Sequence, residues 1–341
     1  MVRRRGVLVL LLFVSGFAAL VYQVLWVREL GLLFGSTAQA AALTIAVFFA
    51  GLGTGGWFWG RRAAGLADSL RGFGLLEVGV AITALGHFML VDAYHAAYPL
   101  IHGLAATSPA LDTLAKAVVA AVILFPPAFL MGGTLPLMGQ HLVRHRTQLS
   151  RTGSGLYAVN TAGSAAGALA AGFVLPLVLG FDLAYLLAVA LDLAVGATTV
   201  ALARRATAVV GPPRHGPRAE PGTVTATTRL PVGLIWAAAF ASGFAALAVE
   251  VIWTRLFAQV LQNSVYTYAL ILTIFLVALA LGAGLANLLA RLPRVSPERL
   301  LIGLLAGSAL AAAAHRGSST PRRAAWTTSA ATWASAPTWR R

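Results

Sequence analysis

The sequence predicts an all-α fold: a polytopic transmembrane helical bundle of about nine spans, major-facilitator-like, with a 6+3 repeat arrangement. Three observations support it: the composition, the apolar runs of span length and an internal repeat. Of the 341 residues, 59% are hydrophobic and 10% are charged, and the mean hydropathy is +0.81. Soluble domains carry about 25% charged residues. A chain with so little charge cannot cover its surface in water, so we expect the lipid bilayer to be its solvent.

The apolar runs define the expected spans. A hydrocarbon core roughly 30 Å thick requires about 20 apolar residues per helix. Runs of about this length recur along the chain, and the last of them is short. They cover residues 6–27, 37–60, 72–92, 115–142, 154–177, 179–203, 232–256, 264–290 and 299–314. Nine spans are therefore expected.

The basic residues predict the orientation. They gather in every second loop, beginning with Arg3–Arg5, and 17 of the 20 Lys and Arg before residue 316 lie in these loops. The exceptions are Arg28, Lys116 and Arg255. Positive residues near helix ends favour the cytoplasmic side, so we expect a cytoplasmic N-terminus. Because the arginines form short clusters between apolar runs, the formal charge of +15 does not indicate nucleic-acid binding.

A sequence repeat relates two parts of the chain. The segment Ser15–Leu30 (SGFAALVYQVLWVREL) recurs as Ser242–Phe257 (SGFAALAVEVIWTRLF), with nine of sixteen positions identical at an offset of 227. The register continues into the next helix, where it pairs Phe48 with Phe275, Leu52 with Leu279 and Gly55 with Gly282. Six spans separate the copies, so both start on the same side of the membrane, as in the parallel halves of major-facilitator transporters. The later copy lies within the chain, which argues that the first is a true span and not a cleaved signal peptide.

These features predict four regions. Residues 1–203 form the first six-helix repeat, and residues 204–231 form a cytoplasmic linker rich in Pro and Arg. Residues 232–314 form a truncated second repeat of three helices, and residues 315–341 form an irregular tail. The tail is either an interfacial segment, with Trp and Arg at the lipid headgroups, or the product of a frameshift. The loss of the repeat register in the same region favours the frameshift.

Four ordered motifs resemble one known family. They are SGFAALVYQVLWVRELGLLFGST, FFAGLGTGG at 48–56, PAFLMGGTLPLM at 127–138 and LYAVNTAGSAAGALAAGF at 156–173. Together they resemble the membrane domain of bacterial fused major-facilitator-like/spermidine synthase (aminopropyltransferase) proteins, over roughly residues 10–310. The resemblance implies a multi-pass protein of the bacterial inner membrane that is connected with polyamines.

In that family the membrane part precedes a soluble catalytic domain, which binds decarboxylated S-adenosylmethionine and a polyamine. This sequence contains no strand–GxGxxG–helix unit and no soluble stretch long enough for such a domain. We therefore expect no catalytic residue and no cofactor in this chain, and whether it acts as an enzyme stays open. The chain has no cysteine, and His141 and His145, four residues apart, could ligate zinc but have no Glu between them. Surface charge is preferred for these histidines, so no metal site is expected.

Polar residues inside the apolar runs are the candidate functional residues. An ionisable side chain at membrane depth costs about 2.5–3.5 kcal/mol on insertion scales, so each one suggests a function. Asp182 and Asp192 belong to the sixth span. The ligand-binding candidates are Gln23, Arg28, Glu77, Asn160, Asp182, Glu250 and Arg255.

The repeat places Gln23 at the position of Glu250, which predicts a cross-repeat cluster of these two residues with Arg28 and Arg255. Such a cluster is either a polar substrate or proton site, or structural pairing at the outer ends of the first and seventh helices. We prefer structural pairing. Asn160 is followed by glycines four residues apart, which permit close helix approach, so packing is preferred to ligand binding.

Three functions follow as hypotheses. The first is a non-catalytic anchor or polyamine-related membrane module, for which Glu77, Asp182 and Glu250 would suit a cationic substrate. The second is a small-solute transporter of major-facilitator type, and the third is a non-functional truncated fragment. The expected partners are the lipid bilayer and a polyamine or other small solute. The sequence does not determine an oligomeric state.

Overall fold

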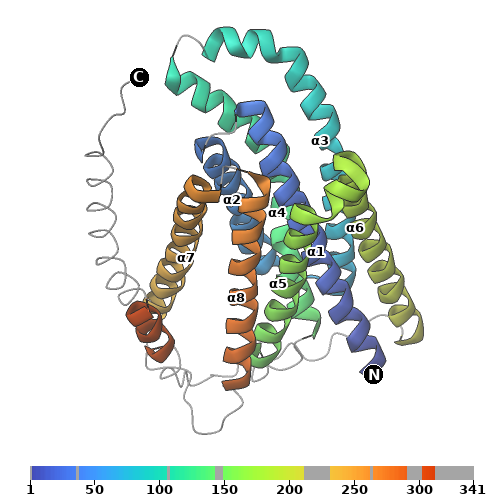
Figure 1. The fold of residues 1–341 in the computed structure, drawn as a ribbon. Helices are drawn as coiled ribbons and strands as arrows, with labels where there is room; N and C mark the ends of the chain where they lie inside the picture. Colours follow the sequence, from blue (N-terminus) through green and yellow to red (C-terminus); the bar gives the residue numbers. More distant parts are fainter. Residues whose placement is uncertain are drawn as a thin grey trace, which may run out of the picture. The chain divides into compact units, whose positions relative to one another are not determined.

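All regular secondary structure in the described part of the chain is helical (Figure 1). The computed structural model describes residues 2–35, 38–105, 108–142, 149–210, 231–261, 264–289 and 302–311. The main helices are α1 (Val2–Phe34), α2 (Ala38–Ala63), α3 (Ser69–Ala105), α4 (Pro109–Leu142), α5 (Leu149–Phe173), α6 (Leu175–Val210), α7 (Val232–Leu261) and α8 (Val265–Leu289). A shorter apolar helix covers Ile302–Ala311. The predicted all-α class is confirmed for these residues.

The chain divides into two compact units, Met1–Asn287 and Leu288–Arg341. The first unit contains α1 to α7 and nearly all of α8. Of the second unit, the structure describes the end of α8 and the short helix. Most of the expected linker, residues 211–230, and all of the expected tail, residues 315–341, lie outside the described residues.

Seven of the described helices are long and apolar enough to cross a membrane. They lie at Arg5–Phe34, Ala40–Ala63, Ser69–Pro99, Ala110–Leu142, Leu175–Arg205, Trp236–Leu261 and Val265–Leu289. Two of the nine expected spans are not among these seven. Of the expected span 299–314 the structure describes Ile302–Ala311, and α5 is long enough but less apolar, because it carries polar residues such as Tyr157 and Asn160. The count of nine stays a prediction.

Near its start, α6 contains a break that the apolar pattern did not predict. Helical geometry is interrupted at Gly180, where φ is +78° and ψ is 177°. This φ lies in the left-handed region that glycine adopts without a steric penalty. The chain reverses direction here, so that the main part of α6 runs antiparallel to α5 (Figure 1).

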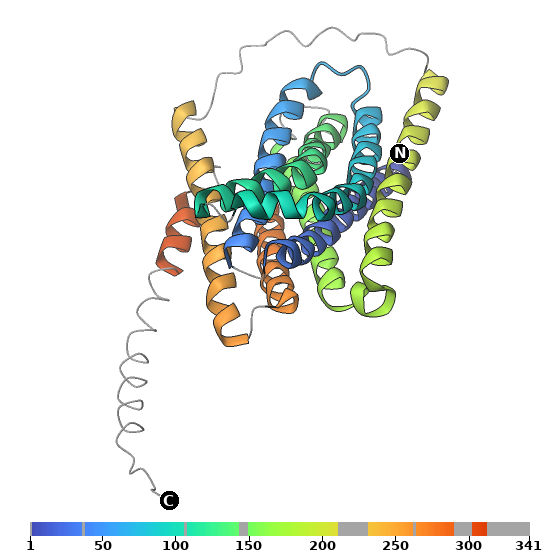
Figure 2. The same ribbon diagram turned by 90° about the horizontal axis from the view of Figure 1, so that it is seen from above.

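Glycines bring helix backbones together at several interfaces. A Cβ added to Gly163 of α5 would overlap the backbone carbonyl of Phe13 in α1, and one added to Gly167 would overlap that of Phe17. In α2, a Cβ on Gly55 would overlap the backbone of α4. The packing role predicted for the glycines that follow Asn160 agrees with the contacts of Gly163 and Gly167. The pairs α2 with α4 and α3 with α6 also lie side by side (Figure 1, Figure 2).

Burial is uneven among the helices. In the most apolar stretch of α1, 56% of the residues are buried, compared with 6% in α7 and 22% in α8. The largest buried side chains, such as Trp26, Tyr22 and Tyr185, belong to α1 and α6. The core of the first unit is therefore built mainly from α1 to α6, with Tyr268, Ala269 and Leu272 of α8 packed into it.

Candidate functional site

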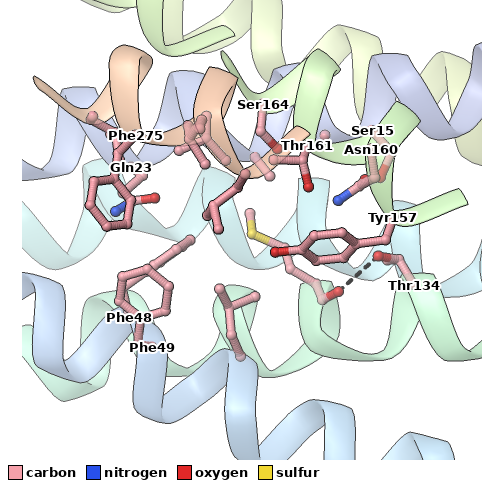
Figure 3. A pocket seen from close by; sticks show the side chains of 18 of the residues that line it. Ser15, Gln23, Phe48, Phe49, Thr134, Tyr157, Asn160, Thr161, Ser164 and Phe275 are labelled. Carbon is pink, nitrogen blue, oxygen red and sulfur yellow. Dashed lines mark hydrogen bonds between the residues drawn. The ribbon is translucent and has the colours of Figure 1, made fainter. Parts of the chain in front are cut away.

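A cavity of about 600 Å³ lies within the first unit, and each of the helices α1 to α8 contributes to its wall. Small-molecule sites typically measure about 300–1,000 Å³. Figure 3 shows that its two ends differ. Phe48 and Phe275 lie at one end, and the polar side chains of Thr134, Tyr157 and Asn160 lie at the other. The cavity thus combines an apolar wall with hydrogen-bonding groups.

The two sequence copies contribute equivalent residues to the cavity. Each lining residue of α1 has a lining residue of α7 at the same offset of 227, and the same holds for α2 and α8. The α1 and α7 residues are Ser15, Gly16, Ala19, Leu20 and Gln23, and Ser242, Gly243, Ala246, Leu247 and Glu250. The α2 and α8 residues are Phe48, Phe49 and Leu52, and Phe275, Leu276 and Leu279. Equivalent faces of the two sequence copies therefore line the same cavity.

Glu77 of α3 and Asp192 of α6 form a buried acidic pair, and each side chain is 2% exposed. Ser15 Oγ donates a hydrogen bond to Glu77 Oε1 at 2.7 Å. Asp192 lies close to Glu77 and to the hydroxyl of Tyr22, and its Oδ2 atom has no hydrogen-bond partner among the described residues. Two carboxyl groups this close cannot both be ionised without compensation. The pair therefore requires a proton or a bound cation.

Glu250 supplies a third carboxyl group to the same cavity. Its side chain is 4% exposed, and its Oε1 atom has no hydrogen-bond partner in the described part of the chain. Gln23 Nε2 donates a hydrogen bond to the hydroxyl of Tyr268 at 3.1 Å, and Glu250 lies near the same tyrosine. Gln23 and Glu250 thus line one cavity from equivalent positions of the two copies.

The ionisable side chains that line the cavity are all acidic. Glu77, Asp192 and Glu250 line it, while its wall contains no Arg, Lys or His among the described residues. In those same residues, no group of three or more His, Asp or Glu is arranged to hold a metal ion. Buried carboxylates require a charge partner, so the wall favours a cation, and its apolar part favours an organic one.

Arg28 and Asp182 lie elsewhere. They line a second pocket together with Glu29, His87 and Asp92. This pocket contains both signs of charge, and the guanidinium of Arg28 also lies over the ring of Phe181, 5.7 Å from its centroid.

An aromatic cluster contacts both pockets. Tyr22 stacks on Trp26 with ring centroids 5.3 Å apart, and Trp26 Nε1 donates to the hydroxyl of Tyr185 at 3.2 Å. Tyr185 in turn stacks on His87 of the second pocket, and Tyr22 lies beside Asp192 of the cavity. These large rings therefore connect Asp192 of the cavity with His87 of the second pocket.

The predicted cluster of Gln23, Arg28, Glu250 and Arg255 does not form. Gln23 and Glu250 line the cavity, Arg28 lines the second pocket, and Arg255 is exposed on α7. Five residues along a helix amount to a rotation of about 140°. Each arginine therefore lies on a different helix face from the polar residue five positions before it.

Asn160 lines the cavity and also packs against α1, since its backbone carbonyl would overlap a Cβ on Gly16. Both roles considered for it are thus compatible with its position. Sequence reasoning did not select Asp192, Ser15 or Tyr22. For Asp192 the signal was available, because it is an acidic residue in the middle of an apolar run.

Comparison with protein-family models, with curated proteins and with solved structures found no match for this chain. The function proposed below therefore rests on the geometry of the cavity.

Proposed function

We propose that this chain is a non-catalytic membrane module that binds a small organic cation of the polyamine class in the cavity. The observation that carries the proposal is the set of three carboxyl groups, Glu77, Asp192 and Glu250, in a wall without a basic side chain among the described residues. An alkylammonium group would supply the missing positive charge. Its methylene chain would pack against the rings of Phe48 and Phe275, which lie beside Gln23 at one end of the cavity (Figure 3).

The spacing of the acidic groups favours a linear amine with more than one charge. Glu77 is hydrogen-bonded to Ser15, while Glu250 occupies the repeat position of Gln23. Ser15 and Gln23 are eight residues apart on α1, a rise of about 12 Å. A linear di- or triamine can place one ammonium group near each acidic position. The resemblance to spermidine synthase fusion proteins supports the same class of ligand.

The proposal includes the orientation predicted from the arginines, with the N-terminus in the cytoplasm of a bacterial cell and the chain in its inner membrane. The polar end of the cavity, with Tyr157 and Asn160, then lies in the half of the bundle where α1 and α5 begin. A cytoplasmic polyamine would meet this polar end first. Fusion of a reporter enzyme to the loops at 64–68 and 211–230 tests the orientation, since both are expected to face the cytoplasm.

The direct test is binding of radiolabelled spermidine to the full chain in nanodiscs. We expect saturable binding that putrescine displaces and a neutral polyol of similar length does not. Glu250→Gln should weaken binding about tenfold, the loss expected for one buried charge interaction of about 1.4 kcal/mol. The matched control is Asp112→Asn, which removes a carboxylate that pairs with Lys116 at 2.8 Å in α4, away from the cavity. Binding no greater than to empty nanodiscs would overturn the proposal.

Transport of a small solute is the second candidate function. It is favoured by the cavity wall, because equivalent residues of two parallel sequence copies face a site between them, as in major-facilitator transporters. Uptake of labelled spermidine into proteoliposomes separates the two functions. Binding without uptake supports the module, and uptake that Glu250→Gln reduces supports the transporter.

A further inference from the structure

In the first sequence copy, one face of α1 holds α5. Phe13, Gly16 and Phe17 of α1 meet Asn160, Gly163 and Gly167 of α5, with backbone against backbone. A side chain at Gly16 would overlap the carbonyl of Asn160. Glycine is therefore required on both helices for this approach.

In the second copy, α7 carries the same three residues at the same offset. They are Phe240, Gly243 and Phe244, which we call the docking face of α7. A Cβ added to Gly243 would meet no atom within 4 Å. Phe240 is 76% exposed and Phe244 67%, and their rings stack on each other with centroids 6.3 Å apart. Within the described residues of the first unit, nothing occupies the place that α5 takes beside α1.

The next helix shows the same contrast. A Cβ on Gly55 of α2 would overlap the backbone of Phe129 in α4, whereas its counterpart Gly282 of α8 meets nothing within 4 Å. The exposed side chains around it include Leu281 and Leu285. The first-copy glycines Gly16 and Gly55 each make a close contact with another helix. Their second-copy counterparts, Gly243 and Gly282, are also glycines but make no such contact.

We propose that the docking face of α7 binds a transmembrane helix with two glycines four residues apart, the chemistry by which α5 binds α1. Bare glycine in a helix interior costs about 1 kcal/mol relative to alanine, and nothing in the described structure requires it at residue 243. A partner backbone would use the space that Gly243 leaves open. The backbone carbonyls of Phe240 and Phe244 would then lie against the glycines of the partner helix, as those of Phe13 and Phe17 lie against Gly163 and Gly167.

The partner helix would also complete the cavity. Beside α1, the polar side chains of Tyr157, Asn160 and Thr161 on α5 form part of the cavity wall. The equivalent edge of the cavity lies beside Ser242 and Gly243 of α7. A partner with a polar residue three positions before its first glycine, as Asn160 precedes Gly163, would bring a hydrogen-bonding group to that edge.

The absence of cysteine from the sequence allows a clean test by fluorescence transfer. The full chain in nanodiscs carries one donor dye at Leu234→Cys, near the start of α7. The probe is a synthetic peptide of residues 149–173 with an acceptor dye. We expect saturable energy transfer from Leu234→Cys and none from a donor at Met89→Cys, an exposed site on α3.

Two variants decide the result. Gly243→Ile should weaken peptide binding at least about tenfold, because the new side chain fills the space for the partner backbone. Gly86→Ile, where an added Cβ also meets nothing within 4 Å, is the matched control and should change nothing. A peptide with Gly163→Ile and Gly167→Ile should not bind.

Three outcomes would overturn the proposal. The first is no energy transfer with any peptide, which would mean that lipid alone covers the docking face. The second is that the peptide with Gly163→Ile and Gly167→Ile binds as tightly as the parent peptide. The third is that the parent peptide binds the Gly243→Ile chain as tightly as the parent chain. None of these involves spermidine, so the fate of this proposal is separate from that of the proposed function.

Discussion

Helices α1 and α7 share nine of sixteen residues over their matched segments, yet their surroundings are opposite. Trp26 of α1 is 1% exposed, whereas the matched Trp253 of α7 is 40% exposed. Phe13 and Phe17 pack beside α5, whereas Phe240 and Phe244 are exposed. The comparison shows that the sequence of a membrane helix determines which contacts it can make, while its neighbours determine which contacts it does make.

The two tryptophans give the largest expected difference. Trp26→Ala removes a ring that stacks on Tyr22 and donates a hydrogen bond to Tyr185, so it should reduce the free energy of unfolding by about 3–5 kcal/mol. Trp253→Ala removes a ring that is 40% exposed, so the loss should be the smaller of the two and stay below about 2 kcal/mol. Unfolding in mixed micelles, followed by far-ultraviolet circular dichroism, measures both. Equal losses would show that α7 is as buried as α1.

Substitution of the matched glycines Gly16 and Gly243 should change the free energy of unfolding by different amounts, with a smaller difference than for the tryptophans. Gly16→Leu forces a side chain against the backbone of Asn160, and overpacking of this kind costs about 1–3 kcal/mol. Gly243→Leu enters open space and should leave the stability within about 0.5 kcal/mol of the parent chain. The same unfolding measurement applies. If Gly243→Leu is as costly as Gly16→Leu, then α7 already has a close neighbour in the folded chain.

Some features of the fold could be predicted from the sequence because they depend on local pattern. Apolar runs locate seven membrane-length helices, and the offset of 227 identifies lining residues such as Gln23 and Glu250 as equivalent. For α5, hydropathy alone does not identify a helix that packs within the bundle. Tyr157, Asn160 and Thr161 lower its apolar character, and all three line the cavity.

The candidate site depends on tertiary structure that no local pattern contains. Glu77 and Asp192 are 115 residues apart in the chain and meet because α3 packs on α6. Asp182 and Asp192 looked equivalent in the sequence, yet the first lines a pocket with Arg28 and the second faces Glu77. The one-residue break at Gly180 was also hidden, since glycine is common in membrane helices.

An exchange of the two equivalent polar residues gives the smallest and most specific effect. Glu250→Gln alone removes one of three carboxyl groups and should weaken spermidine binding about tenfold, or ~1.4 kcal/mol. Adding Gln23→Glu returns a carboxyl group to the same cavity from the equivalent position of the first copy, so the double variant should recover to within about threefold of the parent affinity. The Asp112→Asn chain, titrated with labelled spermidine in the same nanodiscs, controls for the general effect of charge. Recovery would show that the two positions serve one ligand. A double variant no better than Glu250→Gln would mean that the α7 position alone contacts the cation, and that the equivalence of the two copies ends at the cavity wall.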